Sequence, residues 1–327
     1  MSDQQKSVLL LKLVLETCNA TRDSAPQEPT SEPLKVLHKD LVSLTSLLYA
    51  ATTKLSLALK PSSPTYSASL TPLKDLADNL AALFHCSNLF IPEAHGATLV
   101  REVQTLVRDA IESIKALVQT FLDIETSGSR QGSGQAGDEY MVRTATVHNV
   151  LASARTLSAN NLRAVRKRWS EDAASLDDGF RETADMIEEA ESTEDDDVDD
   201  GEELDDGWGD IGIVKGEKMI PDELNRTKKV HGLLRLAQLL HTRILGDILA
   251  TSQKAPNNSV LDSLSSLSHE LLSASDELVS TLYTPQDLDR VKAELTAYRK
   301  NYFRFPSMPS KKTPRAGNTA AKSIVGT

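Results

Sequence analysis

The chain has 327 residues, of which 39% are hydrophobic and only 4% aromatic, and its formal net charge is −11. Sandwich and barrel folds are disfavoured, because they draw on β-branched and aromatic residues, whereas Leu, Ala and Ser dominate here. No stretch approaches the roughly 18 consecutive apolar residues of a membrane span. We therefore expect a soluble, intracellular protein built from helices.

Apolar residues recur three and four positions apart over most of the chain, which predicts amphipathic helices. The first begins near Ser7, in SVLLLKLVL, where Lys12 interrupts a segment that otherwise looks like a signal-peptide core. In the third, we interpret Thr71 as the N-cap and Pro72 as the first helical residue. The second, third and fourth helices are predicted at about 34–60, 72–90 and 97–124.

A Gly/Ser-rich joint is predicted at 127–138. Its glycines, at 132, 134 and 137, match the GxGxxG pattern of dinucleotide-binding loops. That pattern needs a strand before it and a helix after it, and here a helix precedes it, so we interpret it as a linker. Further helices are predicted near 147–157, 162–187, 222–250, 260–283 and 286–303.

An acidic tract interrupts the helical pattern. Between Glu182 and Asp210 there are sixteen Asp and Glu residues and no Lys or Arg. Elsewhere Lys and Arg outnumber Asp and Glu, 36 against 31, so the acidity is local. Like charges at this density repel one another and bury little apolar area, which predicts a disordered linker. The Ser-, Pro-, Lys- and Gly-rich residues after Pro306 are also predicted to be disordered.

These observations predict an all-α fold of antiparallel multi-helix bundles with about nine helices. The predicted organisation is an N-terminal bundle at 4–190, an acidic disordered linker at 191–215, C-terminal helices at 216–305 and a disordered basic tail at 306–327.

No catalytic, metal or cofactor site is predicted. Cys18 and Cys86 lie in amphipathic runs without zinc-ligand spacing, so we expect buried core thiols. His269-Glu270 begins an HExxH motif, but Ser273 stands where the second histidine ligand belongs.

Two basic clusters are candidates for nuclear import or nucleic-acid contact: Arg163, Arg166, Lys167 and Arg168, and in the tail Lys311, Lys312 and Arg315. The first is also explained as a solvated helix face or as a docking site for the acidic tract. Direct nucleic-acid binding is disfavoured, because the tract competes with phosphate for the same cations. Thr313, followed by Pro314, is a candidate phosphorylation site.

Trp208 and Ile211 follow acidic residues and lie three apart, the layout of short motifs that add a strand to a ubiquitin-like modifier. The alternative is that Trp208 pins the linker to the bundle. Both residues are therefore candidate partner-binding positions.

Several segments in order resemble the cyclin-D-binding protein family of the GCIP type. They are HGATLVREVQTLVRDAIESIKALVQTF, the helix from Asn160 to Glu191 that runs into the acidic tract, the Trp208 region as far as Pro221, and SASDELVSTLYTPQDL. The resemblance implies an all-helical fold of the talin and vinculin type with an acidic segment between its two parts. It also implies a non-enzymatic regulator of cell-cycle progression, found in nucleus and cytoplasm, that binds cyclin D and helix-loop-helix transcription factors.

We therefore expect an adaptor that binds a partner helix in a groove between bundle helices. The acidic tract is expected either to cover that groove or to attract basic partners; deleting 192–210 would tighten binding in the first case and weaken it in the second. A cytoskeletal or membrane-associated structural bundle is the alternative, and actin co-sedimentation separates the two.

Overall fold

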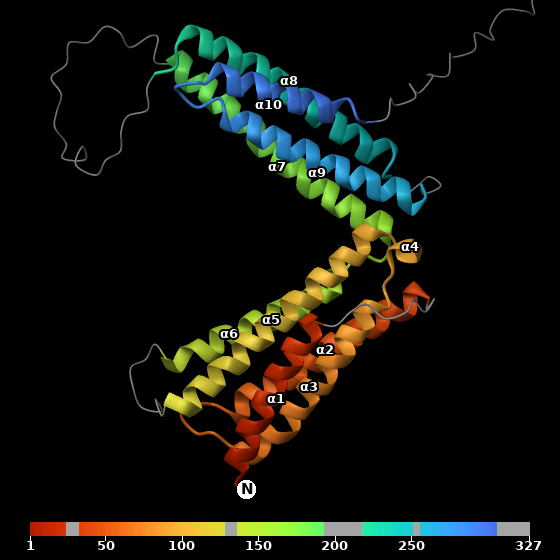
Figure 1. Ribbon diagram of the computed structural model, residues 1–327, viewed down its shortest axis with the longest axis vertical. Helices are drawn as coiled ribbons and strands as arrows, with labels where there is room; N and C mark the ends of the chain where they lie inside the picture. The colour runs from red at the N-terminus through yellow and green to blue at the C-terminus, as the bar shows by residue number, and fades with distance from the viewer. Residues whose placement is uncertain (24–32, 128–135, 193–217, 251–255, 306–327) are drawn as a thin grey trace, which may run out of the picture.

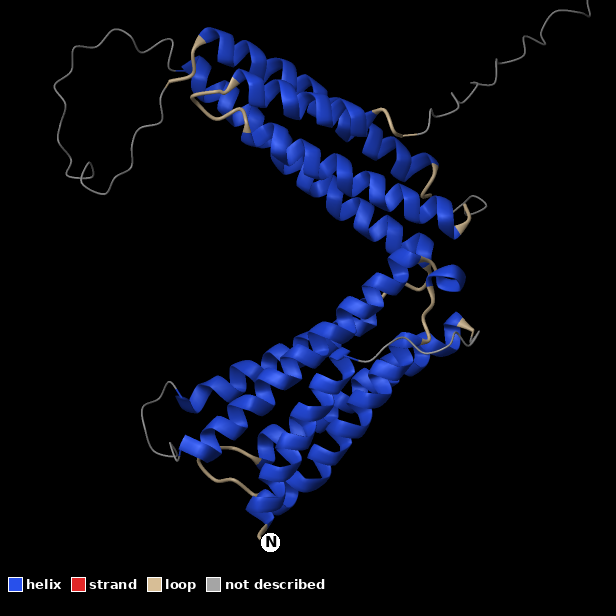
Figure 2. Ribbon diagram, viewed as in Figure 1, coloured by secondary structure: helices blue, strands red, loops and turns tan. Residues whose placement is uncertain are grey.

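The computed structural model describes residues 1–23, 33–127, 136–192, 218–250 and 256–305. These residues form ten α-helices and one short 3-10 helix, and none of them forms a strand (Figure 2). The all-α prediction is confirmed. The helices are α1 (Asp3–Asp23), α2 (Leu34–Ala58), α3 (Tyr66–Asn88), α4 (Pro92–His95), α5 (Ala97–Ser127), α6 (Ala136–Ser153), η1 (Ala154–Thr156), α7 (Asn161–Ser192), α8 (Pro221–Asp247), α9 (Asn258–Ser280) and α10 (Leu288–Tyr302).

Five helices close into a first bundle. Going round it, α1 packs on α3, α3 on α2, α2 on α6, α6 on α5 and α5 again on α1. Their apolar stripes meet in one core of mainly Leu and Val side chains, including Leu48, Leu80 and Leu117, which are fully buried. Burial of such side chains from water is the main stabilising contribution to a bundle of this kind.

The remaining long helices form a second bundle. α7 packs on α8 and α9, and α9 packs on α10 (Figure 1). The core of this bundle is separate from the first and is centred on Trp169 of α7, which contacts α8 through a hydrogen bond from its Nε1 to the His241 carbonyl oxygen (3.1 Å). Figure 1 shows the two bundles meeting at an angle, with the start of α5 close to the start of α7.

The boundary between the bundles differs from the predicted one. We placed 4–190 in one N-terminal unit, but α7 shares its core with α8, α9 and α10, so the change of core falls near 157–161. The acidic tract therefore interrupts the second bundle between α7 and α8. The physical reason is that an apolar stripe shows that a helix buries one face, but it does not show which helix covers it.

A polar network joins the two bundles. Asp262 of α9 accepts hydrogen bonds from the backbone N–H groups of Ala97 and Thr98 (2.8 and 2.9 Å) and so caps the start of α5 across the junction. Asn161, at the start of α7, donates to Asp262 Oδ1 (3.1 Å) and accepts from the Leu99 N–H. Burial acts to raise the pKa of the Asp262 carboxyl, but these hydrogen bonds outweigh burial and lower it.

Gly96 makes this junction possible. Its φ of +89° lies where side chains are strained, and a Cβ there would meet the Asn161 amide at 2.0–2.5 Å. Only a glycine lets the chain turn from α4 into α5 beside Asn161.

The third predicted helix begins earlier than expected. α3 starts at Tyr66, so Thr71 is not its N-cap, and Pro72 lies inside the helix as a buried residue. The earlier start is explained by Tyr66, which packs against the first core and donates its hydroxyl to the Glu125 carboxylate. α6 likewise starts at Ala136 rather than near Val147, because Tyr140 is buried against Phe121.

Cys18 and Cys86 are buried core thiols, as predicted. Burial raises the pKa of the Cys18 thiol to about 12 and that of Cys86 to about 11, so both thiols stay protonated and unreactive. Among the described helices, α2 alone is long and apolar enough to cross a membrane by composition. Nine of its residues, such as Leu41 and Leu55, are buried in the first bundle.

Candidate protein-binding surfaces

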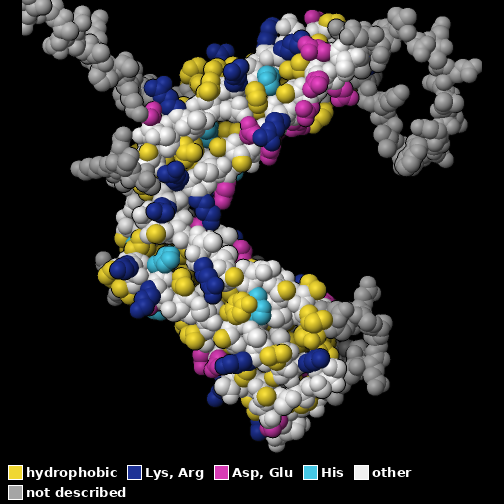
Figure 3. Space-filling view, turned by 180° about the vertical axis from the view of Figure 1, so that it is seen from behind, with side chains coloured by type: hydrophobic (Ala, Val, Ile, Leu, Met, Phe, Trp, Pro, Cys, Tyr) yellow, Lys and Arg dark blue, Asp and Glu magenta, His cyan; other side chains and the backbone are white. Residues whose placement is uncertain are grey.

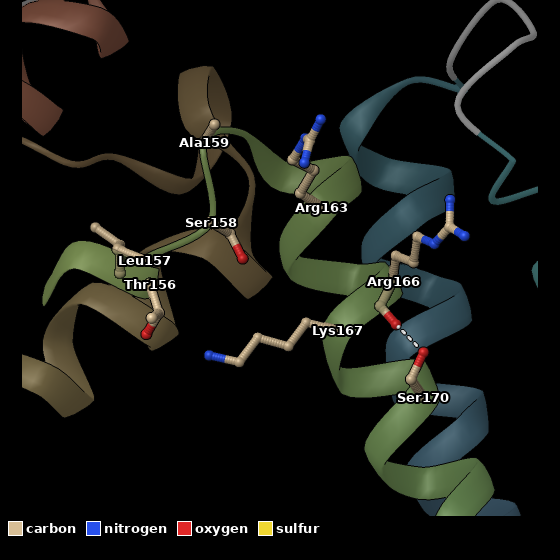
Figure 4. A pocket seen from close by; sticks show the side chains of 8 residues that line it. All are labelled: Thr156, Leu157, Ser158, Ala159, Arg163, Arg166, Lys167 and Ser170. Carbon is tan, nitrogen blue, oxygen red and sulfur yellow. Dashed lines mark hydrogen bonds between the residues drawn. The ribbon is translucent and has the colours of Figure 1, made fainter. Parts of the chain in front are cut away.

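A basic notch lies where the first bundle leads into the second. Its volume is about 420 Å³. One wall is the connection after α6, and the other is the first three turns of α7. We call it the junction notch, and its lining residues are Thr156, Leu157, Ser158, Ala159, Arg163, Arg166, Lys167 and Ser170 (Figure 4).

Three of the four basic residues predicted on this helix line the notch together: Arg163, Arg166 and Lys167. Figure 4 shows Lys167 extending across the notch toward Thr156 and Leu157, while the Arg163 and Arg166 guanidinium groups lie apart from it along α7. Arg168 is not among the lining residues; its guanidinium lies 3.4 Å from Nδ1 of His269 on α9. The sequence cluster is therefore divided between two faces.

Lys167 also links the notch to α5. Its ammonium lies 2.9 Å from Glu102 Oε1, and this hydrogen bond raises the pKa of the lysine above its usual value. A smaller cavity of about 210 Å³ next to the notch is lined by Glu102 and Asp109 together with Lys167. Carboxylates thus lie on the α5 side of Lys167, and arginines lie on the α7 side.

A second surface is apolar and lies on α8. Leu236 and Leu239 are 47% and 57% exposed, and the half-buried Leu233 and Leu240 lie beside them on the same helix. We call these four residues the α8 leucine face. We did not predict this face from the sequence. The signal was present, because α8 has more leucines (Leu233, Leu234, Leu236, Leu239, Leu240) than one buried stripe needs.

A chain of buried polar groups crosses the second core. The Ser268 hydroxyl donates to Asp172 Oδ2 (2.6 Å), and Ser268 Oγ lies 3.1 Å from His241 Nε2. His241 Nδ1 lies 3.1 Å from the Ala237 carbonyl oxygen, and the indole of Trp169 covers the imidazole. Burial lowers the pKa of the His241 imidazole, against the opposing effects of that carbonyl and of the Asp172 carboxylate. We call Asp172, Ser268 and His241 the polar chain.

The polar chain has the residue types of a hydrolytic triad but not its geometry. In a triad the acid orients the histidine, whereas here the acid contacts the serine. Ser268 is 0% exposed, so no substrate reaches its hydroxyl. The described residues hold no cluster of three metal-ligating side chains, and the exposed His269 has the Arg168 guanidinium beside it. The polar chain therefore stabilises the fold.

Two family models match the chain: Grap2 and cyclin-D-interacting, N-terminal, over residues 40–189, and Grap2 and cyclin-D-interacting, C-terminal, over residues 204–301. The chain belongs to this family. No curated protein matches it. The two family-model matches confirm the resemblance that we identified from the sequence.

The Grap2 and cyclin-D-interacting models cover the two surfaces but not all of the fold. The N-terminal model runs from α2 to α7 and so crosses the boundary between the bundles. The C-terminal model contains α8 and its leucine face, whereas α1 precedes both models. The models divide the chain within the acidic tract, as our domain prediction did, although the cores divide before α7.

The other predicted site residues lie outside the described part of the chain. They are the partner-binding candidates Trp208 and Ile211, the tail residues Lys311, Lys312 and Arg315, and the phosphorylation candidate Thr313. Their predicted roles stay predictions.

Proposed function

We propose that this chain is a non-enzymatic adaptor that regulates cell-cycle progression or transcription by binding protein partners of the cyclin D, Grap2 or helix-loop-helix type. Membership of a family described by two protein partners, Grap2 and cyclin D, carries this proposal. In this proposal the protein needs no cofactor, does not bind nucleic acid directly and does not span a membrane.

The α8 leucine face supports a helix-in-groove mode of binding. Its leucines lie at positions 233, 236, 239 and 240, and this spacing presents one apolar stripe to an amphipathic partner helix. A comparable exposed pair, Leu9 and Leu13, lies on α1. We choose α8 because the family models include it, whereas α1 lies outside both.

Titration calorimetry with purified cyclin D and, separately, Grap2 tests the proposal. The full-length chain is compared with the double variant Leu236→Glu, Leu239→Glu. Placing two carboxylates in an apolar contact is expected to weaken binding at least about tenfold, since anchoring side chains contribute more than about 1 kcal/mol each. Because both leucines are about half exposed, the free energy of unfolding of this variant should differ from that of the wild type by no more than about 0.5 kcal/mol.

The matched control is Leu9→Glu with Leu13→Glu on α1, which should leave the affinity unchanged. If the α1 variant loses binding and the α8 variant keeps it, the assigned surface is wrong. If neither cyclin D nor Grap2 binds the wild-type chain at 100 µM, the adaptor proposal for these partners is abandoned.

We also propose that the protein occupies both cytoplasm and nucleus, with Lys311, Lys312 and Arg315 as its import signal and Thr313 as a modification site beside it. Alanine substitution of the three cations should shift a fluorescently tagged chain to the cytoplasm, and an unchanged distribution would refute the signal. For Trp208 and Ile211, binding of a ubiquitin-like modifier that survives their joint substitution by alanine excludes the motif.

A further inference from the structure

We propose that the junction notch binds an acidic, extended segment of a protein partner. This inference rests on the proposed adaptor function. It makes the notch a second surface that contacts the partner, in addition to the α8 leucine face. Three features carry it: the composition of the lining, the unpaired arginines and the spacing of the cations.

The lining of the notch has one sign of charge. Its eight residues include three cations and three hydroxyl groups, from Thr156, Ser158 and Ser170, but no carboxylate. Its volume of about 420 Å³ lies within the range of protein binding pockets. A lining of this composition favours an anionic group because the cations attract it, whereas the Thr156 and Ser170 hydroxyls already donate to the carbonyl oxygens of Ser153 and Arg166.

Two of the cations are not used by the fold. Arg163 and Arg166 have no carboxylate partner within the described residues, whereas Lys167 is paired with Glu102. Guanidinium groups bind carboxylates with two parallel hydrogen bonds, which suits the recognition of an acidic side chain. The arginines therefore supply binding capacity that no described intramolecular contact consumes.

The spacing of the cations selects the shape of the ligand. Arg163, Arg166 and Lys167 lie three and four positions apart, on one face of α7. Figure 4 shows that their charged ends do not converge on one point. A single small anion would meet one of them at a time, whereas a segment with several carboxylates along its length meets them in turn.

Basic side chains are frequent around the bend between the bundles, although Glu102 and Asp109 lie on the α5 side of the notch. Figure 3 shows Lys and Arg side chains around the bend between the bundles, and Asp and Glu side chains gathered at the far end of the second bundle. A segment of negative charge is therefore directed toward the bend and away from that end. Because these groups are exposed to water, the attraction weakens as salt is added.

Fluorescence anisotropy with a fluorescein-labelled peptide of alternating Asp and Glu, ten residues long, tests the proposal on the full-length chain. Arg163→Ala with Arg166→Ala should weaken binding roughly 3- to 20-fold at 50 mM salt, the range expected for two exposed ion pairs. The matched control is Arg290→Ala with Arg299→Ala on α10, two exposed arginines whose side chains form no ion pair within the described residues, and it should leave the affinity unchanged.

Further measurements distinguish an acidic peptide from nucleic acid as the ligand, and separate the notch proposal from the adaptor proposal. No peptide binding at 100 µM, or an equal loss in both double variants, overturns the notch proposal. If a ten-residue oligo-dT binds more tightly than the acidic peptide, and if the Arg163→Ala, Arg166→Ala variant loses that binding, the notch binds nucleic acid and the proposal is overturned. If cyclin D binding is retained by the wild type and lost in the α8 variant while the acidic peptide fails to bind, the notch proposal falls and the adaptor function stands.

Discussion

In the first bundle the core consists mainly of aliphatic side chains, whereas in the second a chain of hydrogen-bonded polar groups runs through the core. Of the described residues, two buried ones carry carboxylates, Asp172 and Glu223, and both belong to the second bundle. Hydrophobic packing tolerates rearrangement, but hydrogen bonds are directional and are lost when helices slide or rotate. The second bundle, which presents the α8 leucine face, is therefore held in one arrangement by its polar chain.

Trp169→Ala should have the largest effect. The side chain is 1% exposed, covers His241 and donates to its carbonyl oxygen, so its removal leaves a cavity and an unpaired acceptor. We expect a loss of about 3–5 kcal/mol in the free energy of unfolding, measured by urea denaturation followed by circular dichroism. Trp169→Phe keeps most of the ring and should cost less. A loss below 1 kcal/mol for the alanine variant contradicts a core centred on Trp169.

Asp172→Ala sharpens the comparison between the two cores. It leaves the buried Ser268 hydroxyl, which also contacts His241, without its carboxylate acceptor, and this should cost about 1–3 kcal/mol. The matched change in the first bundle is Ser69→Ala, which removes a buried neutral contact between Ser69 Oγ and Ser7 Oγ (2.9 Å) and should cost about 0.5–1.5 kcal/mol. If the two variants are equally destabilised in urea, the polar chain has no special role.

The smallest expected effect is a pH dependence from His241. Because burial lowers the pKa of its imidazole below the unfolded value of about 6.5, the unfolded state binds the proton more readily. The contribution of the neutral His241 to the free energy of unfolding is therefore fully present above about pH 6.5. It is lost as the pH falls from there through the pKa of the imidazole in the folded state. His148 and His231, whose pKa values burial also lowers, change stability in the same direction.

Calorimetry of the wild type and of His241→Gln at pH 7.5 and 5.5 isolates this contribution. The fall in Tm between the two pH values should be smaller in the variant, which has no imidazole to protonate in the core. His148→Gln, at a partly exposed position in the first bundle, is the control and should reduce the fall less. An equal fall in the wild type and in His241→Gln would show that His241 does not set the pH dependence.

Much of the fold follows from the sequence, because each long helix carries its own evidence. The apolar stripe at Leu99, Val103, Leu106 and Ala110 and the start at residue 97 predict α5 nearly to its end. The stripe of α7 predicts a helix equally well, but it contains no information about the helix that covers it. The assignment of α7 to the second bundle is therefore visible only in the structure.

The sites divide in the same way. Arg163, Arg166 and Lys167 are neighbours in sequence, so their grouping was predicted, although the notch in front of them was not. Asp172, His241 and Ser268 come from three helices, and each looks ordinary in its own helix. The junction is similar: Asp262 caps a helix that starts 165 positions earlier in the chain, which no local capping pattern reveals.

Hydrogen exchange of the full-length chain, with and without saturating cyclin D, tests the central claim most directly. The account predicts that bound cyclin D slows backbone exchange in α8, around Leu236 and Leu239, and in the first turns of α7 beside the junction notch. Protection confined to the five helices of the first bundle, with α8 exchanging as in the free protein, would contradict it.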